Sequence, residues 1–256
     1  MTAVVAAVCG VLGLAVGSFL NVVIHRVPRK ESVVQPRSRC PRCGTQLADR
    51  DNIPVVSWVM LRGRCRTCGE PISIRYPLVE VATAALFVAA ALRFGWDWVL
   101  PAYLVLFAAL LAISLIDLEH YIIPNRIVYP TLAVSVPLLV LAAAATGHWR
   151  DLEHAAIGAV SGWGLMLAIH LVSPRGMGFG DVRLAFVLGL FLGWLGLSHV
   201  FLGLFLSFLF GSVVGLVLIV LRRRGRRDHI PFGPFLAAGA LVAILVGSPI
   251  LHWYSR

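Results

Sequence analysis

Long stretches without a charged side chain constrain the fold of this chain more than any other feature of its sequence. Five of them have about the 20 residues that a helix needs to cross roughly 30 Å of hydrocarbon. They are residues 2–24, 99–116, 127–147, 154–172 and 230–251. Because 59% of the chain is hydrophobic and only 13% is charged, its apolar share exceeds what a water-soluble core of this size requires. The sequence therefore predicts an integral membrane protein.

Two further segments bring the predicted number of spans to eight. Residues 76–92 form a weaker span, because Glu80 lies near its start, where a carboxylate can still reach the interface. Residues 184–221 carry no charge and are too many for one span, so we expect two short spans hinged near residues 197–199. The predicted fold is an all-α polytopic membrane protein with about eight transmembrane helices.

The basic residues predict the orientation of these spans. Arg26 and Arg29 follow the first apolar run and no basic residue precedes it, so we expect a retained first span with the N-terminus outside. Threading the other spans from that start leaves three of the 22 Lys and Arg outside, namely Arg93, Arg150 and Arg256. So uneven a distribution favours a multi-pass protein of the cytoplasmic membrane with both termini outside.

The net charge of +10 has the same origin. In a water-soluble protein, this excess of basic residues would suggest a nucleic-acid partner. Here the sorting of positive loops to the cytoplasm accounts for it. We therefore expect the lipid bilayer, and no nucleic acid, as a partner.

The largest polar segment, residues 27–75, holds four cysteines with the spacing C-x2-C-x21-C-x2-C. They are Cys40, Cys43, Cys65 and Cys68. Two such pairs can supply the four corners of a tetrahedral zinc site, and Gly44 and Gly69 suit the tight turns that follow them. Two redox or disulfide pairs are the alternative, but a reducing cytoplasm disfavours permanent disulfides. We predict three segments: a first transmembrane helix (1–26), a cytoplasmic zinc-binding insert (27–75) and a polytopic core (76–256).

Two aspartates stand at the edges of predicted spans. Asp181 ends the glycine-rich stretch "GMGFGD" and precedes a span. Taken alone, it could cap a helix by accepting backbone N–H groups, whereas a phosphate-binding loop is a weaker match. Asp117 ends another span, and the predicted topology puts both acids at the cytoplasmic edge. If their helices are neighbours, one carboxyl would keep its proton while the other activates water, as in aspartyl proteases.

Several motifs in order carry a resemblance to a known family. They are "GSFLNVVIHRVP" at 17–28, the four-cysteine insert, "RYPLVE" at 75–80, "IDLEHYIIPN" at 116–125, "GMGFGD" at 176–181 and "IPFGPFLAAG" at 230–239. With these motifs the chain resembles the bacterial type IV prepilin peptidases, which are membrane aspartic proteases of the GxGD kind.

The resemblance implies a bifunctional enzyme. It would remove the basic leader from type IV prepilins or type II secretion pseudopilins at the cytoplasmic face of the inner membrane. It would then methylate the new N-terminal amine with S-adenosylmethionine. The implied catalytic residues are Asp117 and Asp181, and the implied zinc ligands are the four insert cysteines. The glycines Gly178 and Gly180 would give the substrate backbone close access beside Asp181.

Three other functions remain open at this point. A GxGD protease without methyl transfer would share the aspartates, but it would not need the zinc insert. A proton-coupled transporter could use Asp117 and Asp181 as a relay, although a relay needs groups distributed across the membrane. A membrane-anchored zinc-ribbon adaptor would leave both aspartates unexplained. No sequence motif locates a binding site for the methyl donor.

Overall fold

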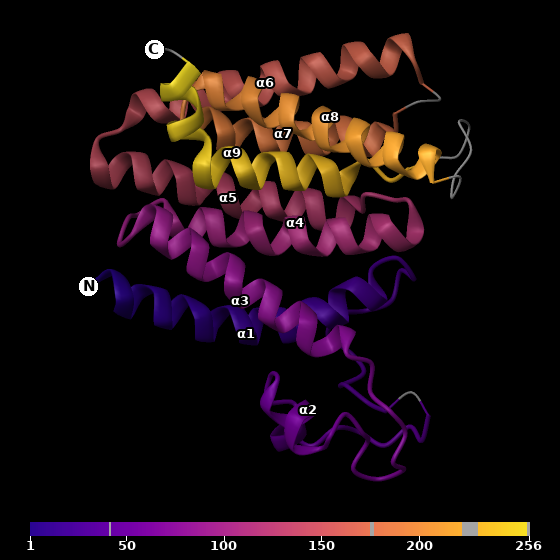
Figure 1. Ribbon diagram of the computed structural model, residues 1–256. Helices are drawn as coiled ribbons and strands as arrows, with labels where there is room; N and C mark the ends of the chain where they lie inside the picture. The colour runs from indigo at the N-terminus through magenta and orange to yellow at the C-terminus, as the bar shows by residue number, and fades with distance from the viewer. Residues whose placement is uncertain (41, 175–176, 222–229, 255–256) are drawn as a thin grey trace. The chain divides into compact units, whose positions relative to one another are not determined.

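The computed structural model describes residues 1–40, 42–174, 177–221 and 230–254. Within them the chain is helical and forms no β-strand, which confirms the all-α prediction (Figure 1). The elements are α1 (Thr2–Arg26), η1 (Asp49–Asp51), α2 (Val56–Met60), α3 (Arg75–Phe94), α4 (Leu100–His120), α5 (Asn125–Thr146), α6 (Trp149–Val172), α7 (Phe179–Trp194), α8 (Leu197–Val220) and α9 (Gly233–Tyr254). Arg175, the arginines of residues 222–227 and Arg256, which the topology prediction uses, lie outside the described residues.

Seven of these helices are long and apolar enough to cross a membrane: α1, α3, α4, α5, α6, α8 and α9. The chain is therefore a membrane protein. The eighth long helix, α7, has 16 residues, or about 24 Å at 1.5 Å per residue. The predicted hinge near residues 197–199 corresponds to the break between Trp194 and Leu197, where Gly196 has a φ of +124°. The eight long helices coincide with the eight predicted spans, but only seven of them meet the length and composition of a membrane span.

By its contacts the chain divides into two compact units, Met1–Leu100 and Pro101–Arg256. In the first unit, α1 and α3 pack side by side, and the insert lies between them in sequence (Figure 1). Their approach is close because Gly17 has no side chain: a Cβ there would lie 2.6 Å from the Cα of Glu80. The predicted segments 1–26, 27–75 and 76–256 place α3 with the polytopic core. The compact units instead group α3 with α1, because these two helices pack together.

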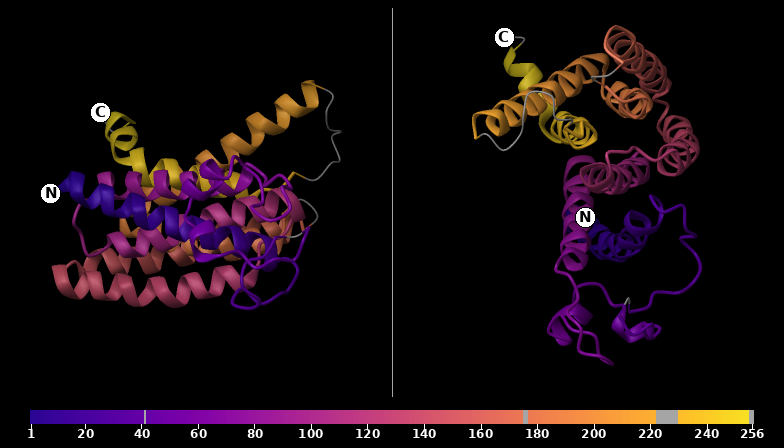
Figure 2. Two further views of the ribbon diagram at one scale, coloured as in Figure 1. Left: turned by 90° about the horizontal axis from the view of Figure 1, so that it is seen from below. Right: turned by 90° about the vertical axis from the view of Figure 1, so that its right-hand side faces the viewer.

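In the second unit, α7 is the internal helix. It contacts α5, α6, α8 and α9, and the right-hand view of Figure 2 looks along these helices. Of its 16 residues, 12 are buried. The closest packing is with α6, where a Cβ on Gly189 would overlap the carbonyl oxygen of Gly158. α4 reaches α7 through Tyr103, whose hydroxyl donates a hydrogen bond to the Phe191 carbonyl at 2.8 Å. The helix that begins just before Asp181 is thus enclosed by protein.

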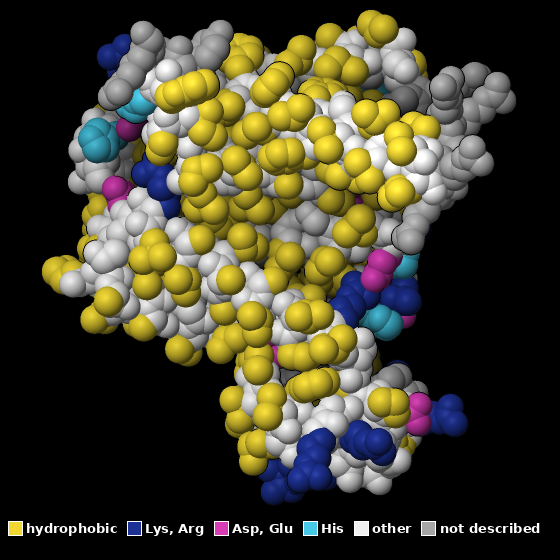
Figure 3. Space-filling view, in the orientation of Figure 1, with side chains coloured by type: hydrophobic (Ala, Val, Ile, Leu, Met, Phe, Trp, Pro, Cys, Tyr) yellow, Lys and Arg dark blue, Asp and Glu magenta, His cyan; other side chains and the backbone are white. Residues whose placement is uncertain are grey.

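The surface of the helices differs in composition from the surface of the insert. Large apolar side chains such as Phe201, Phe205 and Val213 are exposed on α8, and apolar side chains cover the helices in Figure 3. On the same face, Lys and Arg side chains gather on the insert. An apolar surface around helices and a basic surface on the insert are what a lipid-embedded protein with a water-exposed insert requires.

Candidate active site and metal centre

Asp117 lies in the last turn of α4, which continues to His120 instead of ending at Ile116 as expected from the apolar run. Its side chain is buried, with 5% of its surface exposed. The Oδ2 atom accepts a hydrogen bond of 2.9 Å from the backbone N–H of Gly233. Gly233 is the first residue of α9, so the carboxylate sits at a helix N-terminus, where the unpaired N–H groups and the helix dipole favour negative charge.

Asp181 is the third residue of α7 and is also buried. Its Oδ2 accepts the N–H of Gly178 at 3.1 Å, and its own N–H donates to the Gly178 carbonyl at 3.1 Å. This reciprocal pair caps the helix, so the capping interpretation of Asp181 holds for one of its carboxylate oxygens. Capping uses only part of the hydrogen-bonding capacity of a carboxylate.

The structure brings the two aspartates together in one place. The charge of Asp117 acts on Asp181. Ile123, in the turn between α4 and α5, lies beside Gly180, next to Asp181 in sequence, and beside Gly233, the partner of Asp117: Cβ atoms built on the two glycines would meet it at 2.9 Å and 3.4 Å. Two buried carboxyl groups near each other do not readily ionise together. Such a pair can act as acid and base around a water molecule.

Side chains around the dyad fix the segments that carry it. A ring nitrogen of His170, Nδ1, lies 2.8 Å from the Met177 carbonyl, and the ring meets Phe179 edge-on at 5.5 Å. Arg183 lies over the Phe179 ring at 4.7 Å and donates to Asn125 Oδ1 at 2.8 Å. The α4–α5 turn and the start of α7 are therefore joined by polar and cation–π contacts.

Sequence reasoning did not single out Gly233, Ile123 or Asn125 as site residues. The motifs that contain them could have indicated these residues: Gly233 belongs to "IPFGPF", and Ile123 and Asn125 belong to "IIPN". The substrate-access role of Gly178 and Gly180 stays a prediction. The structure supplies a separate reason for the second glycine, since a Cβ on Gly180 would press on the Ile123 Cβ.

The four insert cysteines come together as the spacing predicts. Their sulfur atoms all lie within 4.8 Å of one another, and the Cys40 and Cys68 sulfurs are 3.8 Å apart. A tetrahedral zinc site with Zn–S bonds of about 2.3 Å has sulfur atoms roughly 3.8 Å apart, so the donor set fits the metal. All four thiols are free and form no disulfide.

The two cysteine turns have the same backbone pattern. In the first, the Cys40 N–H donates to Thr45 and the Gly44 N–H donates to Cys40; in the second, the Cys65 N–H donates to Glu70 and the Gly69 N–H donates to Cys65. The two glycines have φ values of +70° and +72°, which residues with a side chain rarely adopt. Each turn therefore presents its pair of sulfurs in the same way.

The thiols differ in their readiness to ionise. Hydrogen bonds with Thr45 lower the pKa of Cys43 to about 6. The pKa of Cys68 rises to about 12, because partial desolvation and the neighbouring thiols disfavour another negative charge, and this outweighs the hydrogen bond from Glu70 that lowers it. A dication removes that penalty, since thiolates are the ligands of a metal ion.

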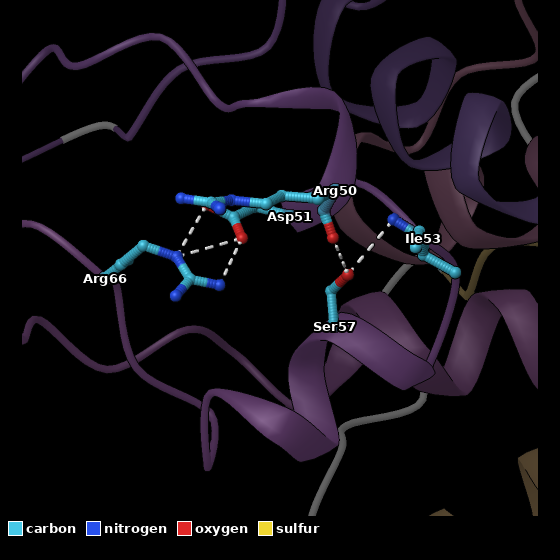
Figure 4. A network of polar contacts seen from close by, with 5 residues as sticks. All are labelled: Arg50, Asp51, Ile53, Ser57 and Arg66. Atoms are coloured by element: carbon cyan, nitrogen blue, oxygen red, sulfur yellow. Dashed lines mark hydrogen bonds and ion pairs between the residues drawn. The ribbon is translucent and has the colours of Figure 1, made fainter.

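A polar network ties the second cysteine turn to the rest of the insert (Figure 4). The Arg66 guanidinium donates to both carboxylate oxygens of Asp51 at 2.7–3.1 Å, and it holds the pKa of Asp51 below its usual range. The Ser57 hydroxyl donates to the Arg50 carbonyl and accepts the Ile53 N–H. The network thus joins the second cysteine turn, η1 and α2.

Comparison with known proteins gives two family matches. Residues 11–94 match the bacterial peptidase A24 N-terminal domain, and residues 104–220 match the type IV leader peptidase family. The two matches fall on either side of the division between the compact units. No solved structure gives a significant match.

Curated relatives extend the match along nearly the whole chain. A prepilin leader peptidase/N-methyltransferase of Aeromonas hydrophila is 39% identical, over 94% of this chain and 90% of the relative. One of Pseudomonas aeruginosa is 39% identical, over 95% and 91%. One of Myxococcus xanthus is 44% identical, over 86% of this chain and 65% of the relative. With its buried aspartate pair and four-cysteine insert, the chain belongs to the type IV leader peptidase family.

Proposed function

We propose that this protein is a membrane aspartyl endopeptidase that removes the basic leader from type IV prepilins or type II secretion pseudopilins, and that it then methylates the new N-terminal amine. The observation that carries the proposal is the buried pair of Asp117 and Asp181 in a chain of this family. Family membership also argues against the transporter and the adaptor. The cysteine insert and the relatives' names favour an enzyme with methyl transfer over a protease alone.

Peptide hydrolysis uses the shared proton of the dyad. The ionised carboxyl takes a proton from water as the water oxygen attacks the scissile carbonyl carbon, and the protonated carboxyl gives its proton to the carbonyl oxygen. Collapse of the tetrahedral intermediate breaks the C–N bond, and the amine leaves with a proton from the dyad. The Gly233 N–H and the start of α9 stabilise the charge of Asp117, which favours it as the base in the first step.

The proposed orientation places this chemistry at the cytoplasmic face of the bacterial inner membrane. Positive-inside sorting puts the insert and both aspartates in contact with the cytoplasm and both termini outside. The basic leader of a substrate, which also stays in the cytoplasm, would then reach the dyad.

Zinc is the proposed metal of the insert, bound by Cys40, Cys43, Cys65 and Cys68. Four thiolates close the coordination sphere and leave no position for water, so the role is structural. Such a metal supplies folding energy that a small insert cannot obtain from its own core.

Methyl transfer requires S-adenosylmethionine as the donor. When bound, the donor would supply an activated methyl group to the lone pair of the neutral amine, and water would take the proton that the amine loses. An α-amino group has a pKa of about 7.7–8.0, so a useful fraction is neutral without a strong base. The aspartates should therefore be dispensable for this step.

The test supplies purified protein with a prepilin or a pseudopilin and reads leader loss and methylation from the mass of the product. Loss of the leader with gain of one methyl group supports both activities, and a comparison of the two substrates identifies the preferred class. A second arm gives pre-cleaved pilin and labelled donor to Asp117→Asn. Label transfer near the wild-type rate supports separate sites; no transfer despite normal pilin binding contradicts them.

A further inference from the structure

The short helix α2 of the insert carries an exposed apolar face. Val56, Val59 and Met60 are 50%, 60% and 76% exposed. Positions i, i+3 and i+4 lie on one side of a helix, so these three side chains form a single face, here called the α2 face. Ile53, just before the helix, is also 50% exposed. Apolar side chains gathered on the surface of a polar segment mark an interaction site.

The opposite side of α2 is packed against the insert itself. Ser57 is buried, and its hydroxyl donates to the Arg50 carbonyl at 2.8 Å. The indole N–H of Trp58 donates to the Ile72 carbonyl at 3.0 Å, and a Cβ on Gly63 would lie 2.9 Å from the Trp58 ring. These contacts fix the rotation of α2 about its own axis, so the α2 face stays turned outward.

A contact with α3 fixes the level of α2 relative to the membrane. α3 has 20 residues, or about 30 Å, which matches the thickness of the hydrocarbon core. Glu80 is the sixth of these residues, about 7.5 Å along the axis from the start of α3.

The Glu80 carboxylate reaches the residue that precedes α2. Its Oε2 accepts the N–H of Val55 at 2.7 Å, and α2 is drawn next to the start of α3 in Figure 1. The side chain of a helical residue tilts toward the N-terminus of its helix. The start of α2 therefore lies within about 7.5 Å of the level at which α3 enters the hydrocarbon.

Basic side chains accompany the apolar face. Arg62 and Arg64 follow α2 directly, and both are exposed. Figure 3 shows apolar side chains along the left margin of the insert and Lys and Arg side chains along its lower edge. Helices that lie in a membrane interface bury an apolar face about 5–10 Å into the boundary between headgroups and acyl chains, and their Lys and Arg side chains attract anionic lipids. The depth and the charge of α2 both fit this pattern.

We propose that the α2 face lies in the lipid leaflet at which α3 begins, among the acyl chains, with Arg62 and Arg64 toward anionic phospholipid headgroups. In the proposed orientation this is the cytoplasmic leaflet. The insert is then attached to the bilayer through its own surface as well as through the helices on either side of it. Because the Asp51–Arg66 contact joins the segment before α2 to the second cysteine turn, the attachment also holds that turn near the membrane. The proposal goes beyond the enzymatic function and does not depend on it.

Photocrosslinking of the full chain in vesicles of mixed neutral and anionic phospholipid tests the position of the α2 face. A benzophenone side chain placed at Met60 should form adducts with lipid acyl chains, as should one at Val81, an exposed site on α3. One at Gln46, an exposed site of the insert outside α2, should form none. Adducts from Met60 only with a second copy of the chain, or only with added pilin, assign the face to that partner and overturn the proposal. Absence of any Met60 adduct, or equal lipid adducts from Gln46, also overturns it.

Hydrogen exchange in lipid nanodiscs tests the attachment with a variant. Val59→Gln, Met60→Gln leaves the charge of α2 unchanged but removes its apolar surface, so the α2 amides should exchange at least about tenfold faster than in the wild type. Val34→Gln, at a 77% exposed site of the insert outside α2, is the matched control and should exchange as the wild type does. The zinc content of each variant checks that the insert remains folded. Equal exchange in the double variant and the wild type overturns the proposal.

The arginines are tested in the same assay. The wild-type α2 amides should exchange more slowly in anionic nanodiscs than in neutral ones, and Arg62→Gln, Arg64→Gln should abolish the difference. A difference that persists in this variant contradicts the role of the two arginines.

Discussion

The Asp117 carboxylate and the Gly233 backbone N–H form a hydrogen bond of 2.9 Å between residues 116 positions apart. The contact joins the end of α4 to the start of α9. It gives the "IPFGPF" motif a specific place, since Gly233 packs so tightly on Asp117 that a Cβ there would lie 2.8 Å from Oδ2. The "IPFGPF" motif therefore contacts Asp117 through the backbone of Gly233.

Gly233→Ala should lower the rate of leader cleavage by roughly 100-fold, because the added methyl group displaces the carboxylate and misplacement by about 1 Å can cost this much. The rate is measured with purified protein and a prepilin. Gly164→Ala is the control, because a Cβ on that α6 glycine meets nothing within 4 Å. Equal rates for the two variants would show that the Gly233 contact does not position the dyad.

Gly180→Ala should also slow cleavage, by about tenfold or more, because its methyl group would press on Ile123. If packing is the reason, Ile123→Ala in the same chain should restore most of the rate. If Gly180 instead gives room to the substrate backbone, the second substitution should not help. The rates of the single and double variants decide between the two roles.

The insert should carry about one zinc per chain, measured by elemental analysis of purified protein. Cys40→Ser should lower both the metal content and the thermal stability of the insert, since a structural metal supplies folding energy. Cys9→Ser, a buried thiol on α1 outside the cluster, should keep the full content. A full complement in the Cys40→Ser, Cys68→Ser double variant would reject the site.

The orientation predicts which positions a membrane-impermeant maleimide can reach in intact cells. A cysteine at His148, between α5 and α6, should react from outside, whereas one at Gln46 in the insert should react only after the membrane is opened. The reverse pattern would overturn the orientation and, with it, cleavage at the cytoplasmic face.

The helices and the metal cluster could be predicted from local patterns. Lipid allows only segments that satisfy their own backbone hydrogen bonds, so the length of an apolar run largely defines a helix. The run of residues 184–221 even indicated the break that lies at Gly196. Cysteine spacing likewise specified the metal cluster, because two short turns bring each pair of sulfurs together.

The contacts between distant segments could not be predicted in the same way. α7 is apolar on nearly all sides, so its sequence has no polar face to indicate which helices surround it. The contact of Gly233 with Asp117 depends on how α9 packs, which no local pattern encodes. One partner of Glu80 is the backbone N–H of Val55, whose position depends on the fold of the whole insert.

The initial rate of leader cleavage by purified Asp117→Asn, Asp181→Asn and the double variant tests the central claim most directly. Asn keeps the size of the side chain but cannot share the proton, so each single variant should lose at least about 1,000-fold, and the double variant should be hardly slower than either. Asp151→Asn, in the first turn of α6, should retain the wild-type rate. Leader cleavage near the wild-type rate by a well-folded Asp117→Asn or Asp181→Asn protein would contradict the aspartyl mechanism.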